Sequence, residues 1–128
     1  MKITIFTCNQ PRHNYLINLF SKVADELFVV QESYTIFPGE NKGLYKKNKI
    51  VKNYFRGVKN AENKIFKNSI VENKSKSIKL LPLSFGDLNN CSFNILKNFL
   101  KSELYIVFGC SFIKGKLANF LIKRKAIN

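Results

Sequence analysis

The sequence predicts an α/β fold: a doubly wound domain built on a mostly parallel sheet of four to five strands. Two observations predict it. Short runs of β-branched and aromatic residues alternate with segments of helical periodicity. The first strand, helix and second strand also follow one another directly, as in a unit whose strands lie parallel. The length of 128 residues fits one domain, residues 1–128, and 45% hydrophobic residues suffice for a buried core.

The N-terminal residues show the clearest pattern of strand, helix and strand. Lys2–Cys8 is short and rich in β-branched and aromatic residues, which is typical of a buried strand. Residues 13–24 predict a helix, because their apolar side chains trace one helical face. We expect that face to comprise Tyr15, Leu16, Leu19, Phe20 and Val23. Residues 27–30 form a second apolar run and therefore a second strand.

The middle of the chain is more polar. Residues 33–44 contain Pro38 and two glycines and are expected to be a loop, and residues 72–77 are expected to be a connection. Between them, residues 45–70 predict a long amphipathic helix, with Gly57 as the place where it could be interrupted. Its inward residues are expected to be Ile50, Val51, Tyr54, Phe55, Val58, Ala61, Ile65 and Phe66.

In the C-terminal part, predicted strands again alternate with predicted helices. Residues 78–83 predict a third strand, which Pro82 makes short or places at an edge. Leu104–Phe108 is a fourth strand, and it lies between two predicted helices, residues 92–101 and 116–125. The inward residues of these helices are expected to be Phe93, Leu96, Phe99, Leu100, Leu117, Phe120 and Leu121.

Residues 126–128 look like the beginning of a fifth strand. We therefore expect the domain to be truncated, that is, incomplete at its C-terminal end. The fourth strand would then have an open edge, which invites pairing or aggregation.

The charge balance is strongly basic: 22 Lys and Arg stand against 8 Asp and Glu, a formal net charge of +14. Such a charge suggests nucleic acid, a membrane surface or an anionic ligand. A compositional explanation competes, because abundant Lys, Asn, Ile and Phe are what an A/T-rich coding sequence gives. Only Arg12, Arg56 and Arg124 are arginines, although arginine is the usual residue for phosphate and base contacts. A small basic module that binds nucleic acid or an acidic partner remains the alternative function.

Metal and disulfide chemistry have little support. The cysteines, Cys8, Cys91 and Cys110, are odd in number and widely spaced, and His13 is the only histidine. We expect three reduced, largely buried thiols and no metal. No apolar run is long enough for a membrane span or a signal peptide, so we expect a cytoplasmic protein with no membrane partner.

The first turn is a candidate ligand site. Cys8, Asn9, Gln10 and Arg12 follow the first strand and open a helix, where open α/β sheets bind ligands and helix N-termini favour anions. No glycine fingerprint occurs there, so a free-standing nucleotide binder is the weakest hypothesis. Either these side chains hold an anionic or sugar group, or the turn is simply capped with Arg12 in solvent. His13 is expected to be a surface or capping residue.

The second candidate turn follows the fourth strand. Gly109 allows a close backbone approach, and the apolar Phe112 and Ile113 should face the ligand crevice. Together with backbone amides they predict an apolar slot for a flat heteroaromatic ligand. Cys110 is a weak candidate nucleophile, because no histidine or acid is visibly placed to activate it.

Three segments resemble the amino-terminal half of folate-dependent formyltransferases, a family that includes methionyl-tRNA and sugar-nucleotide N-formyltransferases. They are KITIFTCNQPRHNYLINLF at residues 2–20, IKLLPLSFGDLNN at residues 78–90 and ELYIVFGCSFIKGKLANFLIKRKAIN at residues 103–128. The last resembles the family's strand, folate loop, helix and strand leading into a catalytic Asn-x-His. The resemblance implies a Rossmann-like sheet and transfer of a formyl group from 10-formyltetrahydrofolate to an amine.

The resemblance also implies roles for residues. Asn128 matches the catalytic asparagine that stabilises the oxyanion. The folate loop matches Phe108, Gly109, Cys110, Ser111, Phe112 and Ile113, and the acceptor side matches Cys8, Asn9, Gln10 and Arg12. The family's histidine and aspartate would lie beyond Asn128. We therefore expect this chain to be inactive alone, with an amino sugar nucleotide or methionyl-tRNA as acceptor and a complementary C-terminal half as partner.

Overall fold

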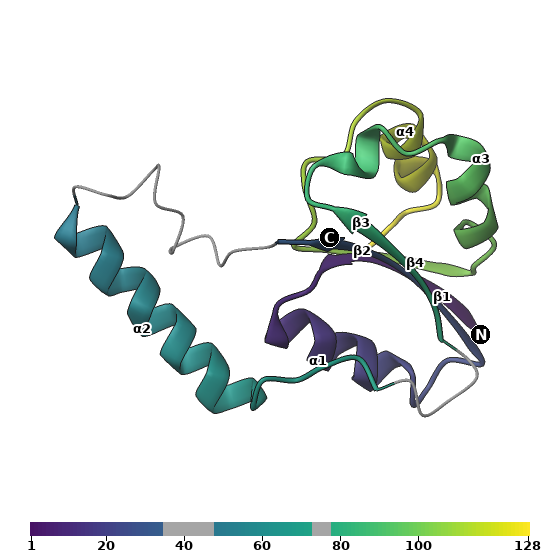
Figure 1. Ribbon diagram of the computed structural model, residues 1–128. Coiled ribbons are helices and arrows are strands. Elements are labelled where there is room, and N and C mark those ends of the chain that lie inside the picture. The colour runs from purple at the N-terminus through teal and green to yellow at the C-terminus, as the bar shows by residue number, and fades with distance from the viewer. Residues whose placement is uncertain (35–47, 73–77) are drawn as a thin grey trace.

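The computed structural model describes residues 1–34, 48–72 and 78–128, and its centre is a parallel four-stranded sheet with helices on both faces (Figure 1). The sheet order is β3-β2-β1-β4, and every neighbouring pair is parallel. The strands are β1 (Lys2–Cys8), β2 (Glu26–Ser33), β3 (Ile78–Ser84) and β4 (Leu104–Phe108). The predicted α/β fold, a Rossmann-like parallel sheet, is confirmed, and so is the edge position of the strand that contains Pro82.

Helices lie on both faces of the sheet. In Figure 1, α1 lies below the sheet and α3 and α4 above it, while α2 packs against α1 and lies to the left, away from the sheet. Short 3₁₀ turns flank α3. The elements are α1 (Pro11–Phe20), α2 (Lys49–Phe66), η2 (Asp87–Asn89), α3 (Phe93–Leu96), η3 (Lys97–Phe99) and α4 (Gly115–Lys123).

The core has two parts because successive side chains of a strand point to opposite faces. From β1, Ile3 and Ile5 pack with Ile17 of α1 on one face. Phe6 packs with Leu117 and other residues of the α3–α4 layer on the opposite face. Burial on both faces explains why the central strands are continuous apolar runs.

The first helix differs from its prediction in bounds and in buried face. It begins at Pro11, whose missing N–H costs nothing at the first helical position, and ends at Phe20. Tyr15, Leu19 and Val23 are exposed, so most of the expected inner face is wrong. The inner side is more polar, with His13, Asn14 and Ile17, because the Asn14 amide is hydrogen-bonded there.

The Asn14 amide explains this orientation. Its Nδ2 donates to the carbonyl oxygens of Asn9 and Ser69, and its Oδ1 accepts from Gln31 Nε2 at 2.9 Å. A buried amide with all of these partners costs little to bury. Helical periodicity of apolar residues could not show this, because both sides of the helix carry apolar residues.

The second helix is uninterrupted at Gly57 and shorter than predicted. The Asn48 side chain caps its N-terminus, and Lys67 ends it in the left-handed conformation. Four of the predicted inward residues are exposed, because α2 packs against α1 along one side only. They are Ile50, Tyr54, Ala61 and Ile65. Most of the predicted loop and connection on either side of this helix lies outside the described residues.

The C-terminal third matches its predicted strand and differs in one helix. The predicted helix at residues 92–101 is one turn, α3, followed by η3, and the inward position expected for Phe93 is wrong because its side chain is exposed. Ile127 forms a parallel bridge with Ile106, and its N–H donates to the Tyr105 carbonyl oxygen. The outer edge of β4 is thus partly covered. Within the described ranges, no helix is both long and apolar enough to cross a membrane.

Candidate functional site

The carboxyl ends of β1 and β4 lie side by side, and the chain leaves them toward opposite faces of the sheet. After β1 it enters α1, and after β4 it enters α4 on the other face (Figure 1). In open parallel sheets the crevice at such a point is where ligands bind. Both turns that the sequence singled out begin at this edge.

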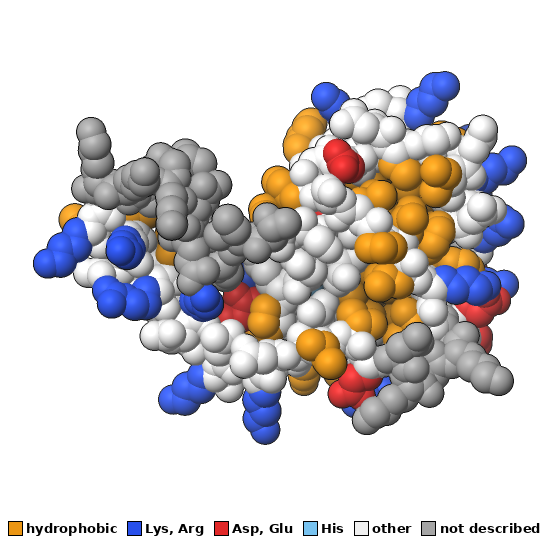
Figure 2. Space-filling view, in the orientation of Figure 1, with side chains coloured by type: hydrophobic (Ala, Val, Ile, Leu, Met, Phe, Trp, Pro, Cys, Tyr) orange, Lys and Arg blue, Asp and Glu red, His pale blue; other side chains and the backbone are white. Residues whose placement is uncertain are grey.

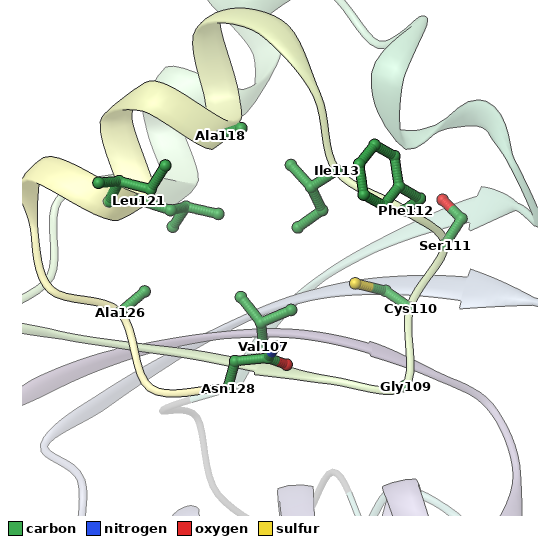
Figure 3. A pocket seen from close by; sticks show the side chains of 11 residues that line it. Val107, Gly109, Cys110, Ser111, Phe112, Ile113, Ala118, Leu121, Ala126 and Asn128 are labelled. Atoms are coloured by element: carbon green, nitrogen blue, oxygen red, sulfur yellow. The ribbon is translucent and has the colours of Figure 1, made fainter.

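A pocket of about 390 Å³ opens beside the turn that follows β4. Figure 3 shows Val107, Cys110 and Ile113 around the space under α4, with Asn128 beside Val107 on the side of the pocket that faces α4. No charged side chain is among its described lining residues, which suits an uncharged, flat ligand group. The lining residues are Val107, Gly109, Cys110, Ser111, Phe112, Ile113, Ala118, Leu121, Ile122, Ala126 and Asn128.

The pocket unites residues that the sequence analysis proposed separately. Of the six residues predicted to contact the cofactor, all but Phe108 line it, and so does Asn128. The Phe108 ring instead makes an edge-to-face contact with His13, with ring centroids 5.0 Å apart. The turn after β4 and the residues after α4 therefore form one cavity, although Gly109 and Asn128 are well separated in sequence.

A buried carboxylate that sequence reasoning missed holds the turn in place. Glu32, at the end of β2, is 0% exposed. Its oxygens accept from the Ser111 N–H at 2.6 Å and from the Ser111 hydroxyl at 2.8 Å. They also accept from the Gly86 and Leu88 N–H groups at 2.9 and 3.2 Å. One side chain thus joins three segments at this edge of the sheet. Its only sequence signal is an acid at the end of an apolar strand.

Asn89 provides a second support for the same turn. Its Nδ2 donates to the Phe112 carbonyl oxygen at 2.7 Å, and its Oδ1 accepts from the Lys114 N–H at 2.9 Å. The amide therefore bridges both sides of Ile113. Glu32 and Asn89 thus hold the pocket wall through hydrogen bonds within the protein, and a wall held in this way loses less entropy when a ligand binds.

Gly109 meets a steric demand that only glycine satisfies. Its φ of +72° lies in the left-handed region. A Cβ added there would lie 2.6 Å from His13 Nε2, so the imidazole occupies the space beside the backbone. The turn and α1 are therefore packed tightly together where β1 and β4 end.

His13 is buried, so its expected surface or capping position is wrong. It is 1% exposed, and neither ring nitrogen has a hydrogen-bond partner among the described residues. Burial, helped by the charge of Arg12, lowers its pKa from 6.5 to about 4. The imidazole is therefore neutral at pH 7. It does not line the pocket.

The thiols near the site are protonated at neutral pH. Burial, followed by the charge of Glu32, raises the pKa of Cys110 to about 11 and that of Cys8 to about 12. A thiol with so high a pKa is a poor nucleophile. Cys8 is fully buried, whereas Cys91 and Cys110 are half-buried. Cys110 contributes a small apolar wall to the pocket.

The first turn is largely committed to internal contacts. Asn9 Oδ1 accepts from the Tyr34 N–H, and Asn9 Nδ2 donates to the Tyr34 carbonyl oxygen. The Arg12 guanidinium donates to a Glu62 carboxylate oxygen at 2.8 Å, and the Arg12 N–H donates to the other oxygen at 3.2 Å. Gln10 is buried, and its Oε1 has no partner among the described residues.

Of the two alternatives left open for this turn, Arg12 in solvent is wrong, because Arg12 is paired with Glu62; the carboxylate of Glu62 occupies the position that the other alternative gave to an anionic or sugar group. Its carboxylate meets an N–H of the first turn of α1, the position that helix geometry makes favourable for negative charge. The four predicted acceptor-side residues lie together at the end of β1, and none of them lines the pocket. In the part of the chain that the structure describes, no group of three or more His, Cys, Asp or Glu side chains could hold a metal ion.

Comparisons with known proteins give no relative: no family model, no curated protein and no solved structure matches this chain. Function is therefore inferred from the residues and their geometry.

Proposed function

We propose that this chain is the donor-binding part of a formyltransferase, with 10-formyltetrahydrofolate as formyl donor and an amine as acceptor. The observation that carries the proposal is the pocket, which the turn after β4 and Asn128 line together. The acceptor is an amino sugar nucleotide or methionyl-tRNA, as the resemblance of residues 2–20 and 103–128 implies.

The pocket suits the ring system of the donor. Its volume of about 390 Å³ falls in the range of small-molecule sites. Val107, Ile113 and Leu121 offer apolar surface to a flat heteroaromatic ring. Glu32 and Asn89 hold the turn from behind, so its backbone is in place before binding.

The same pocket supports only part of the chemistry. When an amine attacks the formyl carbon, an oxyanion develops, and the Asn128 side chain can donate a hydrogen bond to it. No imidazole or carboxylate is among the described residues that line the pocket, and the only histidine, His13, is buried elsewhere. We infer that the chain binds the donor and needs a complementary C-terminal half for rapid transfer.

Binding is tested with 5-formyltetrahydrofolate, a stable probe of the donor site, by isothermal titration calorimetry. Ala118→Leu, which fills the pocket from α4, should weaken binding roughly five- to a hundredfold, since overpacking typically costs about 1–3 kcal/mol. Asn119→Leu is the matched control, because Asn119 is the exposed neighbour on the same helix. Absence of binding to the unchanged chain, or equal affinity for both variants, would contradict the proposal.

Catalysis is tested separately with 10-formyltetrahydrofolate and each acceptor, by mass spectrometry of the formylated product. Because loss of one oxyanion donor alone costs about 10²–10³ in rate, the isolated chain should show no turnover above background. Addition of a formyltransferase C-terminal half should raise the rate. Robust transfer by the isolated chain would disprove the need for that half.

A further inference from the structure

Helix α2 carries an apolar stripe that no described part of the protein covers. Ile50, Tyr54 and Ile65 are 80%, 66% and 66% exposed. At 3.6 residues per turn they lie within about 60° of one another around the helix axis. The exposed Ala61 lies between them. The helix packs beside α1 (Figure 1), and it does so by a different side, which contains the buried Glu62.

The rest of the helix surface is basic. Lys49, Lys52, Arg56 and Lys64 are exposed on the side that turns away from α1. Figure 2 shows Lys and Arg side chains gathered over this part of the surface. The one acidic residue of α2, Glu62, is paired with Arg12 and does not offset this charge at the solvent side. An apolar stripe beside a polar face whose only charged side chains are basic is the pattern of helices that lie in a membrane interface.

The positive charge of α2 and of the whole chain distinguishes between three possible binding partners for the apolar stripe. A second copy of the chain would bring two basic faces together, and the formal net charge of +14 opposes self-association. A nucleic acid would satisfy the lysines but would leave the exposed isoleucines in water. An anionic bilayer satisfies both, because lipid phosphates pair with the lysines while the apolar side chains enter the boundary below the headgroups.

We propose that α2 docks this protein on the surface of an anionic bilayer, with Ile50, Tyr54 and Ile65 inserted and Lys49, Lys52 and Lys64 bound to headgroups. The proposal is independent of the pocket and of formyl transfer. It requires no membrane-spanning helix, and it differs from our expectation of no membrane partner, which considered only a span.

The test is cosedimentation with phosphatidylcholine vesicles that contain, or lack, about one-third phosphatidylserine. The protein should bind only the anionic vesicles, and less at about 0.5 M NaCl than at low salt. Ile50→Ser with Ile65→Ser should weaken binding at least tenfold, because two large apolar side chains no longer leave water. Val23→Ser with Ile95→Ser removes two exposed apolar side chains elsewhere and should change binding less than twofold.

The role of the α2 lysines is tested with two triple variants that have the same net charge as each other. The triple variant Lys49→Gln, Lys52→Gln, Lys64→Gln should bind roughly 100-fold more weakly, at about 1 kcal/mol per lysine near the surface. The control triple variant removes three exposed lysines elsewhere and should retain most of the binding. Its substitutions are Lys97→Gln, Lys101→Gln and Lys123→Gln.

Three results would overturn the proposal. The first is no binding to anionic vesicles at low salt. The second is that each α2 variant binds vesicles as strongly as its control variant, which would mean that overall charge alone attracts the protein to the vesicles. The third is binding to single-stranded RNA that survives the isoleucine substitutions while vesicles are not bound, which would make α2 a nucleic-acid surface.

Discussion

Glu32 shows how much one buried side chain can organise. Its carboxylate takes four hydrogen bonds from the turns after β3 and β4, and the Ser111 N–H bond is among the shortest at 2.6 Å. A buried carboxylate is tolerated because its oxygens are satisfied in this way. The shape of the pocket wall therefore depends on a residue that does not line it.

Replacement of Glu32 by Gln should loosen this wall. Gln keeps the size but places an NH₂ group opposite backbone N–H donors, so at least one donor loses its partner. We expect the free energy of unfolding to fall by about 1–3 kcal/mol and binding of 5-formyltetrahydrofolate to weaken at least tenfold. Urea denaturation and calorimetry measure the two effects. Glu103→Gln, at an exposed site, is the control, and unchanged affinity in Glu32→Gln would disprove the positioning role.

His13 makes stability depend on pH. Because its folded-state pKa is lowered to about 4, the folded protein resists a proton that the unfolded chain accepts at about pH 6.5. As the pH is lowered from about 6.5 to about 4, the free energy of unfolding should therefore fall by up to about 1.4 kcal/mol per pH unit. His13→Leu cannot titrate and should lack this part of the pH dependence in urea denaturation.

The same residue gives a direct measurement. Since the chain has one histidine, its Cε1–H resonance in an NMR titration is unambiguous. A midpoint near pH 4 is expected, and one near 6.5 would show that His13 is hydrated rather than buried.

Gly109 and Gly57 are predicted to respond in opposite directions to the same change. Gly109→Ala should destabilise the protein by about 2–4 kcal/mol, from left-handed strain and from the clash with His13. Gly57→Ala should stabilise it by about 0.5–1 kcal/mol, because Gly57 lies within α2 with nothing within 4 Å of the added Cβ. Thermal unfolding of both variants measures this, and equal shifts would contradict it.

Among the elements, strands were predicted better than helices. Lys2–Cys8 and Leu104–Phe108 have the predicted bounds, because a strand buried on both faces is a continuous apolar run with abrupt ends. Helix faces were predicted less well. In α1 and α2 the apolar residues cover more than one side, so periodicity alone could not tell which side meets the sheet or the neighbouring helix.

The candidate site was predicted in part for the same reason. The turn after β4 could be found because a glycine and two apolar residues follow a strand directly. Glu32, His13 and Glu62 could not, because their roles depend on partners from distant segments. A lone acid or histidine carries no pattern in the sequence that distinguishes a buried position from an exposed one.

An ion pair with a buried carboxylate contributes to the attachment of α2, beside the ring contact of Tyr15 with Phe66. Glu62 joins α2 to the start of α1 through Arg12. Glu62→Ala should let α2 open separately, with its amides exchanging roughly three- to fivefold faster while those of β1 stay protected, since an ion pair whose arginine is partly exposed contributes up to about 1 kcal/mol. Hydrogen exchange measures this, with Asn60→Ala on the exposed side as control. Uniform acceleration in both elements would mean global destabilisation instead.

At the scale of the whole molecule, the pocket, the buried histidine and the first turn meet at one edge of the sheet. The carboxyl ends of β1 and β4 bring together segments from both ends of the chain. The basic amphipathic helix α2 packs against α1, and α1 lies on the opposite face of the sheet from α4, which lines the pocket (Figure 1). The molecule therefore separates a ligand site from a surface suited to an anionic bilayer.

The strand order also means that one edge of β1 stays unpaired for part of the time that the chain is being synthesised. β1 pairs early with β2, since Ile3 lies opposite Leu27, but its other edge pairs with β4, where Ile3 meets Leu104. Once β2 ends at Ser33, a ribosome that adds about 5–20 residues per second needs roughly 4–14 s to reach Leu104. Throughout that interval the central strand of the nascent sheet has one bare edge. The chain is therefore exposed to wrong pairing while it is being made, and its yield in the cell should depend on chaperones that cover that edge.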